Sequence, residues 1–130
     1  MNRYDSEWWS VDLPDDWRTE RDDTCTAMFS KSGVGALQIS AVRNNDGPAT
    51  DDDLKDFAKA HLDAGAPVKP VNYGAFMGFY LHYSLDNFYQ RQWWLRCADT
   101  VVLATYTSDL EDKGIEDGVV DNILKTLQRK

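Results

Sequence analysis

The fold is decided by residues 76–107, which read FMGFYLHYSLDNFYQRQWWLRCADTVVLATYT. Two sets of side chains alternate along this stretch, and a period of two is typical of β-strands. Asp86-Asn87 and Ala98-Asp99 interrupt the alternation, and both pairs are suited to short turns. Strands joined by short turns form an antiparallel meander, so the sequence predicts only strands over residues 68–107.

Three shorter strands are expected before the meander. Residues 8–13 alternate with an apolar face and end at Pro14, after which Asp15-Asp16 form a turn and Trp17 returns to the core. The expected inward-facing residues of the three strands are Trp9, Val11 and Leu13, then Cys25, Ala27 and Phe29, then Leu37, Ile39 and Ala41. The charged residues 18–23 are expected to form a connector.

Two helices separate and follow these strands. Thr50 is a good N-cap, and Asp53 three residues later resembles the second half of a capping box. Gly65 and Pro67 end this helix, which has apolar residues at helical spacing: Leu54, Phe57, Ala58 and Leu62. The last helix is expected over residues 115–127, with an apolar stripe of Ile115, Val119, Val120, Ile123, Leu124 and Leu127.

This order of elements predicts one α+β domain over residues 1–130. We expect a largely antiparallel sheet of about six to seven strands with two main helices packed on it. A chain of 130 residues lies in the usual range for a single domain and can bury a core without disulfides or metals.

The composition is acidic, with 14 Lys and Arg against 22 Asp and Glu and a net charge of −8. Such a field repels phosphate backbones and anionic lipid surfaces, so we expect neither nucleic acid nor membrane as a partner. No apolar stretch is long enough to span a membrane, and the first residues lack the apolar core of a signal peptide. We therefore expect a cytoplasmic location, with Cys25 and Cys97 as buried thiols; a single disulfide between them is the alternative.

No catalytic or metal-binding motif is recognisable. Zinc sites need about four Cys or His ligands at short spacing, and His61, His82, Cys25 and Cys97 are scattered. A dyad of His82 with either cysteine across the strands stays open. The acidic triplet Asp51 to Asp53 is explained by its place at the start of a helix. We predict no metal and no cofactor, and an enzyme is the less favoured interpretation.

The meander carries the candidate binding residues. Tyr80, His82, Gln92, Trp94 and Arg96 alternate with Phe79, Leu81, Trp93 and Leu95 and are expected to share the opposite face. If that face is open, it offers the aromatic and arginine side chains that are enriched at binding hot spots. The alternative, that a helix covers the face, is favoured because large aromatic residues are mostly buried.

The stretch from Trp9 through Leu13-Pro14-Asp15-Asp16 to Trp17 resembles the start of PsbP-like proteins, in which a short strand ends in Leu-Pro-x-x-Trp. The later order of helix, meander and C-terminal helix is also similar. The superfamily includes the photosystem II protein PsbP, the Ran-binding factor Mog and chaperones of type VI secretion effectors. The resemblance implies an antiparallel sheet with helices packed on it and a role in binding proteins without catalysis. It transfers no functional residue.

Three functions are compatible with these features. The first is a non-enzymatic protein-binding role, as an adaptor, an effector chaperone or an immunity-type partner. The second is a small-ligand-binding domain or small enzyme with a cleft beside the sheet, and the third is a structural dimerising module. The chain is accordingly expected to be a monomer or a homodimer.

Overall fold

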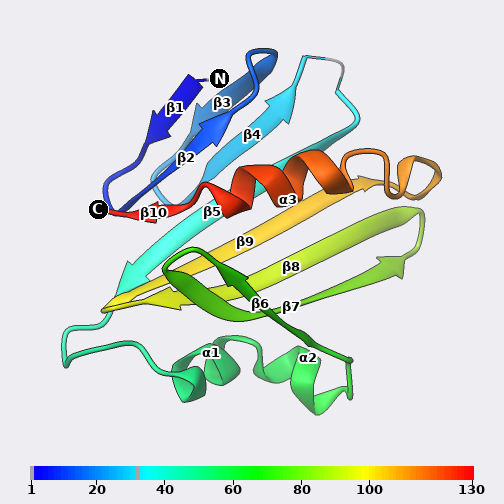
Figure 1. The fold of residues 1–130 in the computed structure, drawn as a ribbon. Helices are drawn as coiled ribbons and strands as arrows, with labels where there is room; N and C mark the ends of the chain where they lie inside the picture. Colours follow the sequence, from blue (N-terminus) through cyan, green and yellow to red (C-terminus); the bar gives the residue numbers. More distant parts are fainter. Residues whose placement is uncertain (1, 32) are drawn as a thin grey trace.

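A computed structural model describes residues 2–31 and 33–130 and shows ten strands in two antiparallel sheets (Figure 1). The larger sheet has seven strands in the order β3-β4-β5-β9-β8-β7-β6. Its strands are β3 (Trp17–Arg21), β4 (Thr26–Ser30), β5 (Gly35–Arg43), β6 (Lys69–Tyr73), β7 (Phe76–Leu85), β8 (Phe88–Cys97) and β9 (Thr100–Asp109). The predicted meander is confirmed as β7, β8 and β9, and the α+β class is confirmed with it.

The smaller sheet joins the two ends of the described chain. Strand β2 (Trp9–Leu13) pairs on one side with β1 (Asn2–Asp5) and on the other with β10 (Gln128–Arg129). Side chains reinforce this pairing, because the Arg3 guanidinium donates to Ser10 and Gln128. The sequence did not predict this second sheet, since a two-residue strand carries no alternation.

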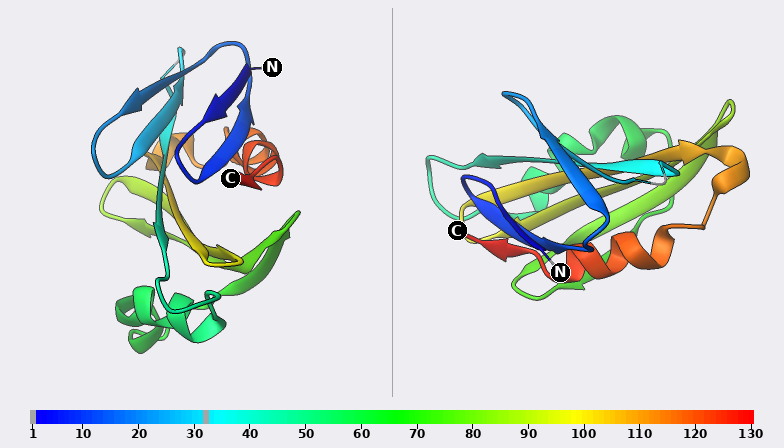
Figure 2. Two further views of the ribbon diagram at one scale, coloured as in Figure 1. Left: turned by 90° about the vertical axis from the view of Figure 1, so that its left-hand side faces the viewer. Right: turned by 90° about the horizontal axis from the view of Figure 1, so that it is seen from above.

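Three helical segments and one short 3-10 turn complete the fold. These are α1 (Asp51–Phe57), α2 (Lys59–Asp63), α3 (Asp117–Lys125) and η1 (Leu110–Asp112). Figure 2 shows α3 and the smaller sheet on one side of the seven-stranded sheet, with α1 and α2 on the other side. We call these two sides the α3 face and the α1 face.

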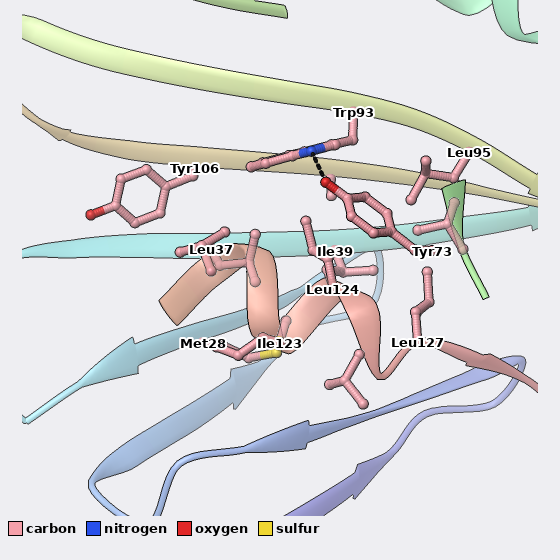
Figure 3. Close-up of a cluster of buried hydrophobic side chains, with 14 of the residues drawn as sticks. Met28, Leu37, Ile39, Tyr73, Trp93, Leu95, Tyr106, Ile123, Leu124 and Leu127 are labelled. Atoms are coloured by element: carbon pink, nitrogen blue, oxygen red, sulfur yellow. Dashed lines mark hydrogen bonds between the residues drawn. The ribbon is translucent and has the colours of Figure 1, made fainter. Parts of the chain in front are cut away.

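The main core lies on the α3 face, between the seven-stranded sheet, α3 and β2 (Figure 3). Met28, Leu37 and Ile39 from the sheet meet Ile123 and Leu124 of α3 there, all of them buried. The Trp93 indole N–H donates to the Tyr73 hydroxyl across 3.1 Å, so the polar atoms of two buried aromatics satisfy each other. The predicted inward positions of β2 and β5 are confirmed, except that Ala41 is only half-buried.

A second, smaller core lies on the α1 face. Leu54 and Ala58 of the first helical segment pack there against Leu81, Trp94 and Val101 of the sheet. The capping box is confirmed, since the Thr50 backbone N–H donates to Asp53 at 2.9 Å and the Asp53 N–H donates to Thr50 Oγ1 at 3.2 Å.

Several boundaries and faces differ from the prediction. Residues 18–21 of the predicted connector 18–23 belong instead to the edge strand β3, in which only Trp17 is buried, so the strand gives no apolar alternation. In β4 the buried residues are Thr26, Met28 and Ser30 instead of the opposite set, because the register places Met28 opposite the buried Leu37. The thiol of Cys25 precedes this strand and is half-buried, as is that of Cys97, and neither forms a disulfide.

The helices also differ at their ends. The first helix is divided at Ala58, whose φ of −93° and ψ of 6° separate α1 from α2. The last helix begins at Asp117, two residues after the predicted start, because Gly114 with φ of 87° turns the chain just before it. Ile115 is consequently exposed instead of buried.

Candidate functional site

The five predicted binding residues do not share one face of the sheet. Tyr80 pairs with Trp93 and His82 with Arg91, whereas Phe79 pairs with Trp94. Residues directly opposite each other in an antiparallel pair project from the same face. Tyr80 and His82 therefore lie on the α3 face, and Gln92, Trp94 and Arg96 lie on the α1 face. The predicted single surface was wrong.

The error arose at the turn between the two strands. Asp86 and Asn87 form a two-residue turn, which pairs Leu85 with Phe88. Odd-numbered residues of β7 are therefore paired with even-numbered residues of β8, and their side chains project from the same side of the sheet. The alternation of side chains within each strand was predicted correctly. What was predicted wrongly is which residues of β7 and β8 share a face of the sheet.

On the α3 face, a buried arginine occupies the region around Tyr80. The Arg91 Nη2 donates to Asp121 at 2.8 Å, and Nη1 lies 3.7 Å from Asp117. The guanidinium also lies over the rings of Trp93 and Tyr80, 4.6 Å and 5.4 Å from their centroids. Burial acts to lower the pKa of Arg91, but the hydrogen bond and charge of Asp121 hold it above its ordinary value. This cluster fastens α3 to the sheet.

Two tyrosines of the sheet also form hydrogen bonds that hold α3 and the residue before it in place. The Tyr89 hydroxyl donates to Asp117 at 3.1 Å, and burial, followed by the charge of Asp117, raises its pKa to about 12. The Tyr106 hydroxyl donates to the buried Glu116 at 2.8 Å. These groups are partnered inside the protein and hold α3 against the sheet.

On the α1 face, Trp94 is covered by the first two helical segments and is only 5% exposed. Its ring lies 5.6 Å from that of His61 in α2 and 5.4 Å from that of Phe79. The expectation that a helix covers the aromatic face is confirmed for Trp94. Gln92 lies beyond the helices and is half-buried, and its amide donates to the Tyr83 hydroxyl at 3.3 Å.

Beside this covered region lies an open groove of about 540 Å³. It runs between α1, strand β6 and the first half of β7, and we call it the α1 groove. Its lining residues are Asp51, Lys55, Val68, Pro70, Val71, Asn72, Met77, Gly78, Phe79 and Arg96. Val68 and Met77 are exposed apolar side chains of this lining, so part of the floor is uncovered hydrophobic surface.

Charged groups form the rim of the α1 groove. The Arg96 Nε donates to Asp51 at 2.8 Å, and this hydrogen bond, together with the charges of Arg96 and Lys55, lowers the pKa of Asp51. Two cations face one carboxylate here. Among the lining residues of the α1 groove, the cations thus outnumber the carboxylates by one, on a protein whose net charge is −8.

Arg96 is the predicted binding residue that the structure places in this groove. Val68, Pro70 and Met77 were missed because the sequence cannot show where the covering helix ends. One signal was available: the register Met77↔Arg96 follows from the two-residue turn, and it places an apolar side chain next to the predicted cation.

The cysteine–histidine dyads left open by the sequence are excluded by the topology. His82 pairs with Arg91, six residues before Cys97 on the neighbouring strand, which corresponds to roughly 20 Å along the sheet. Cys25 precedes β4, and four strand spacings separate β4 from β7, again roughly 19 Å. Burial and the neighbouring Asp22 raise the pKa of the Cys25 thiol, which is the reverse of what an activated nucleophile needs.

Within residues 2–31 and 33–130, no group of three or more His, Cys, Asp or Glu side chains is arranged to hold a metal ion. None of the helices in this part of the chain is long and apolar enough to cross a membrane.

Comparisons with known proteins define the class of fold. No protein-family model matches the chain, and no curated protein matches it in sequence. Among solved structures, a protein from Bacteroides thetaiotaomicron VPI-5482 superposes with a TM-score of 0.70 and 16% identity. The match covers 95% of this chain but only 45% of the Bacteroides protein, so the chain spans less than half of that protein's length.

The cyanobacterial PsbP (CyanoP) from Synechocystis sp. PCC 6803 is similar over nearly the full length of both proteins. The TM-score is 0.53 at 10% identity, covering 99% of this chain and 92% of CyanoP. The chain therefore has a PsbP-like fold, as its opening residues predicted. At this identity the similarity describes the fold alone.

Proposed function

We propose that this protein is a non-enzymatic protein-binding module that holds an extended segment of a partner protein in the α1 groove. The observation that carries the proposal is the open groove itself, which has exposed apolar side chains on its floor and two cations on its rim. Uncovered apolar surface bordered by polar groups is typical of protein interaction sites.

The rim defines the chemistry of the segment. Lys55 and Arg96 outnumber Asp51, so an acidic side chain of the partner would gain from the groove, while its apolar neighbours would contact Met77 and Val68. Because Arg96 is already oriented by Asp51, its guanidinium loses little conformational freedom on binding. We also propose a cytoplasmic location, which the free state of both cysteines supports.

A displayed library of random peptides, selected on the immobilised protein, tests this function. We expect selected peptides to combine acidic and apolar residues and to shift the amide resonances of Lys55, Met77 and Arg96. The variant Met77→Glu should lose the selected peptides. Val119→Glu, which places the same charge at another exposed apolar position, should retain them. Peptides that shift only resonances outside the groove, or a selection that yields none, would contradict the proposal.

A small ligand is the second candidate, because the volume of about 540 Å³ lies within the range of small-molecule sites. A screen of small carboxylic acids by the same amide shifts distinguishes it from a peptide site. A dimerising role predicts instead that the protein sediments as a dimer, with Met77→Glu shifting it to the monomer.

A further inference from the structure

The α1 groove carries polar side chains at one end and apolar side chains at the other. The strand register defines two rows of residues across its floor. In the first row Asn72 of β6 is opposite Met77 of β7, which is opposite Arg96 of β8. In the second row Pro70 of β6 is opposite Phe79 of β7. We call these the polar row and the apolar row, and all five residues line the groove.

The two rows follow each other along the strands. Met77 and Phe79 are two residues apart in β7, so their side chains project from the same face and the rows lie roughly 7 Å apart. The exposed Val68, two residues before Pro70, lines the groove beyond the apolar row. The floor of the groove therefore has a direction, from the polar row through the apolar row to Val68.

The polar row has groups that can bind a carboxylate and a peptide backbone. The Arg96 Nε donates to Asp51, and within residues 2–31 and 33–130 neither Nη atom of Arg96 donates a hydrogen bond. The charge of Lys55 also acts on Asp51, so this second cation belongs to the same end. The amide of the exposed Asn72 can both donate and accept, and it has no hydrogen-bond partner in the described part of the chain. A guanidinium with two free Nη groups suits bidentate binding of a carboxylate.

The apolar row has the opposite preference. Its two side chains, Pro70 and Phe79, carry no polar group, and neither does the neighbouring Val68. The Phe79 ring lies 5.4 Å from the ring of the buried Trp94, which holds it in place. An apolar side chain gains from leaving water here, whereas a carboxylate would lose its hydration without a hydrogen bond from the floor.

We propose that the α1 groove binds segments with the pattern acidic-x-apolar-x-apolar, in either chain direction. This inference rests on the proposed function and names the sequence of the partner segment. An extended segment and a β-strand share the same two-residue repeat, so alternate side chains of the segment fall on successive rows. The carboxylate then binds Arg96, and the two apolar side chains contact the apolar row and Val68. Met77 contacts the aliphatic part of the acidic side chain, and Asn72 binds the backbone of the segment.

Four synthetic peptides of equal composition test the pattern on the full chain. Two have the order Ser-Glu-Ser-Leu-Ser-Leu-Ser and its reverse. The third places glutamate in the middle, Ser-Leu-Ser-Glu-Ser-Leu-Ser, and the fourth removes the alternation, Ser-Glu-Leu-Leu-Ser-Ser-Ser. All carry blocked termini, so that glutamate supplies the only carboxylate. We expect one of the first two to bind at least about tenfold more tightly than the third and fourth, which cannot place all three side chains together.

A nitroxide label on the best-binding peptide tests the direction of the segment. Placed beside the glutamate, the label should broaden the amide resonances of Asn72 and Arg96 more than that of Val68. Placed beside the leucine farthest from the glutamate, it should broaden Val68 more than the other two. This readout depends on the position of the bound peptide and not on its affinity.

A variant of the protein tests the carboxylate contact. Arg96→Gln should weaken the best-binding peptide by about tenfold, as expected for the loss of a charged hydrogen bond, but should not affect the same peptide with glutamine in place of glutamate. Arg18→Gln, at an exposed arginine of β3 outside the groove, is the matched control and should leave both affinities unchanged. Amide spectra verify that both variants remain folded.

The outcomes separate this inference from the proposed function. If the four peptides bind in the groove with equal affinity, or if both label positions broaden the two ends equally, the groove binds peptides without the proposed order. The inference then fails while the proposed function stands. If peptides selected from the random library bind in the groove but none of these four does, the pattern is wrong. If no peptide of either set shifts the groove resonances, both proposals are wrong.

Discussion

Gly78 is the residue at which strands β7 and β8 leave no space for a side chain. A Cβ atom at this position would clash with the carbonyl oxygen of Trp94 and would lie 3.1 Å from Cδ1 of Leu54. The nearest obstacle is backbone, which cannot rotate away. Glycine at this position thus allows the strand pair and α1 to meet beside the α1 groove.

Replacing Gly78 by alanine is expected to lower the free energy of unfolding by about 2–3 kcal/mol, in the upper part of the range for overpacked positions. Urea denaturation measures the change. The matched control is Gly118→Ala in α3, where a Cβ would contact nothing within 4 Å. This control should stabilise the protein by about 0.5–1 kcal/mol, since glycine is unfavourable within a helix. Equal effects of the two substitutions would refute the close approach at Gly78.

For single residues, the sequence predicted which side chain could bind a partner better than it predicted which other side chains lie beside it. Arg96 was predicted as a binding residue and lines the α1 groove, but it was grouped with Tyr80 and His82, which project from the other face. Alternation within a strand follows from local geometry. The phase between two strands depends on the turn, and neither central residue of Asp86-Asn87 is the glycine that makes such turns recognisable.

Among the elements, α1 depends most on its first residues. It is a short helix, and helices of this length are marginal without capping and tertiary contacts. Thr50 and Asp53 satisfy each other's backbone N–H groups, and the Asn44 amide also donates to Asp53 at 2.9 Å. These contacts hold Leu54 against Trp94.

Thr50→Ala is expected to cost about 1 kcal/mol of stability, the usual effect of removing an N-cap side chain. Because α1 covers Trp94, we also expect faster hydrogen exchange of the Trp94 indole N–H, measured by NMR. Asp52→Ala serves as the control, since this exposed residue adds first-turn charge but no side-chain cap. An unchanged exchange rate in Thr50→Ala would mean that other contacts keep α1 in place.

Elements with a strong internal pattern were predicted, and elements defined by distant partners were not. The capping residues of α1 and the alternation of the meander are local signals, and both are confirmed. Strand β3 is recognised only by its pairing with β4, because an edge strand with charged side chains resembles a loop in sequence. Strand β10 likewise exists through β2, more than a hundred residues away in the sequence.

For the whole molecule, buried phenol groups set an alkaline limit to stability. Burial is the main cause that raises the pKa of Tyr73, Tyr89 and Tyr106, with Tyr89 reaching about 12. Because these pKa values are higher in the folded than in the unfolded protein, the phenol groups stabilise the fold as long as they remain protonated. The stabilisation is therefore complete below about pH 10, the ordinary tyrosine pKa, and is lost as the pH rises towards 12.

We expect the thermal unfolding midpoint to fall progressively between about pH 10 and pH 12. Tyr89→Phe should be less stable at neutral pH, because Asp117 loses a hydrogen-bond donor, but its midpoint should fall less steeply over the alkaline range. Calorimetry at several pH values compares the two proteins. If the unfolding midpoints of the unchanged protein and of Tyr89→Phe fall equally steeply with pH, Tyr89 does not contribute to the alkaline limit.

Strand β7 connects the α1 groove with the turn at its far end. Met77 lines the groove and Leu85 precedes the turn, and eight steps along a strand correspond to roughly 27 Å. Between them every residue of β7 is paired with a residue of β8. A partner segment seated in the groove would therefore be held at a constant distance from the β7–β8 turn.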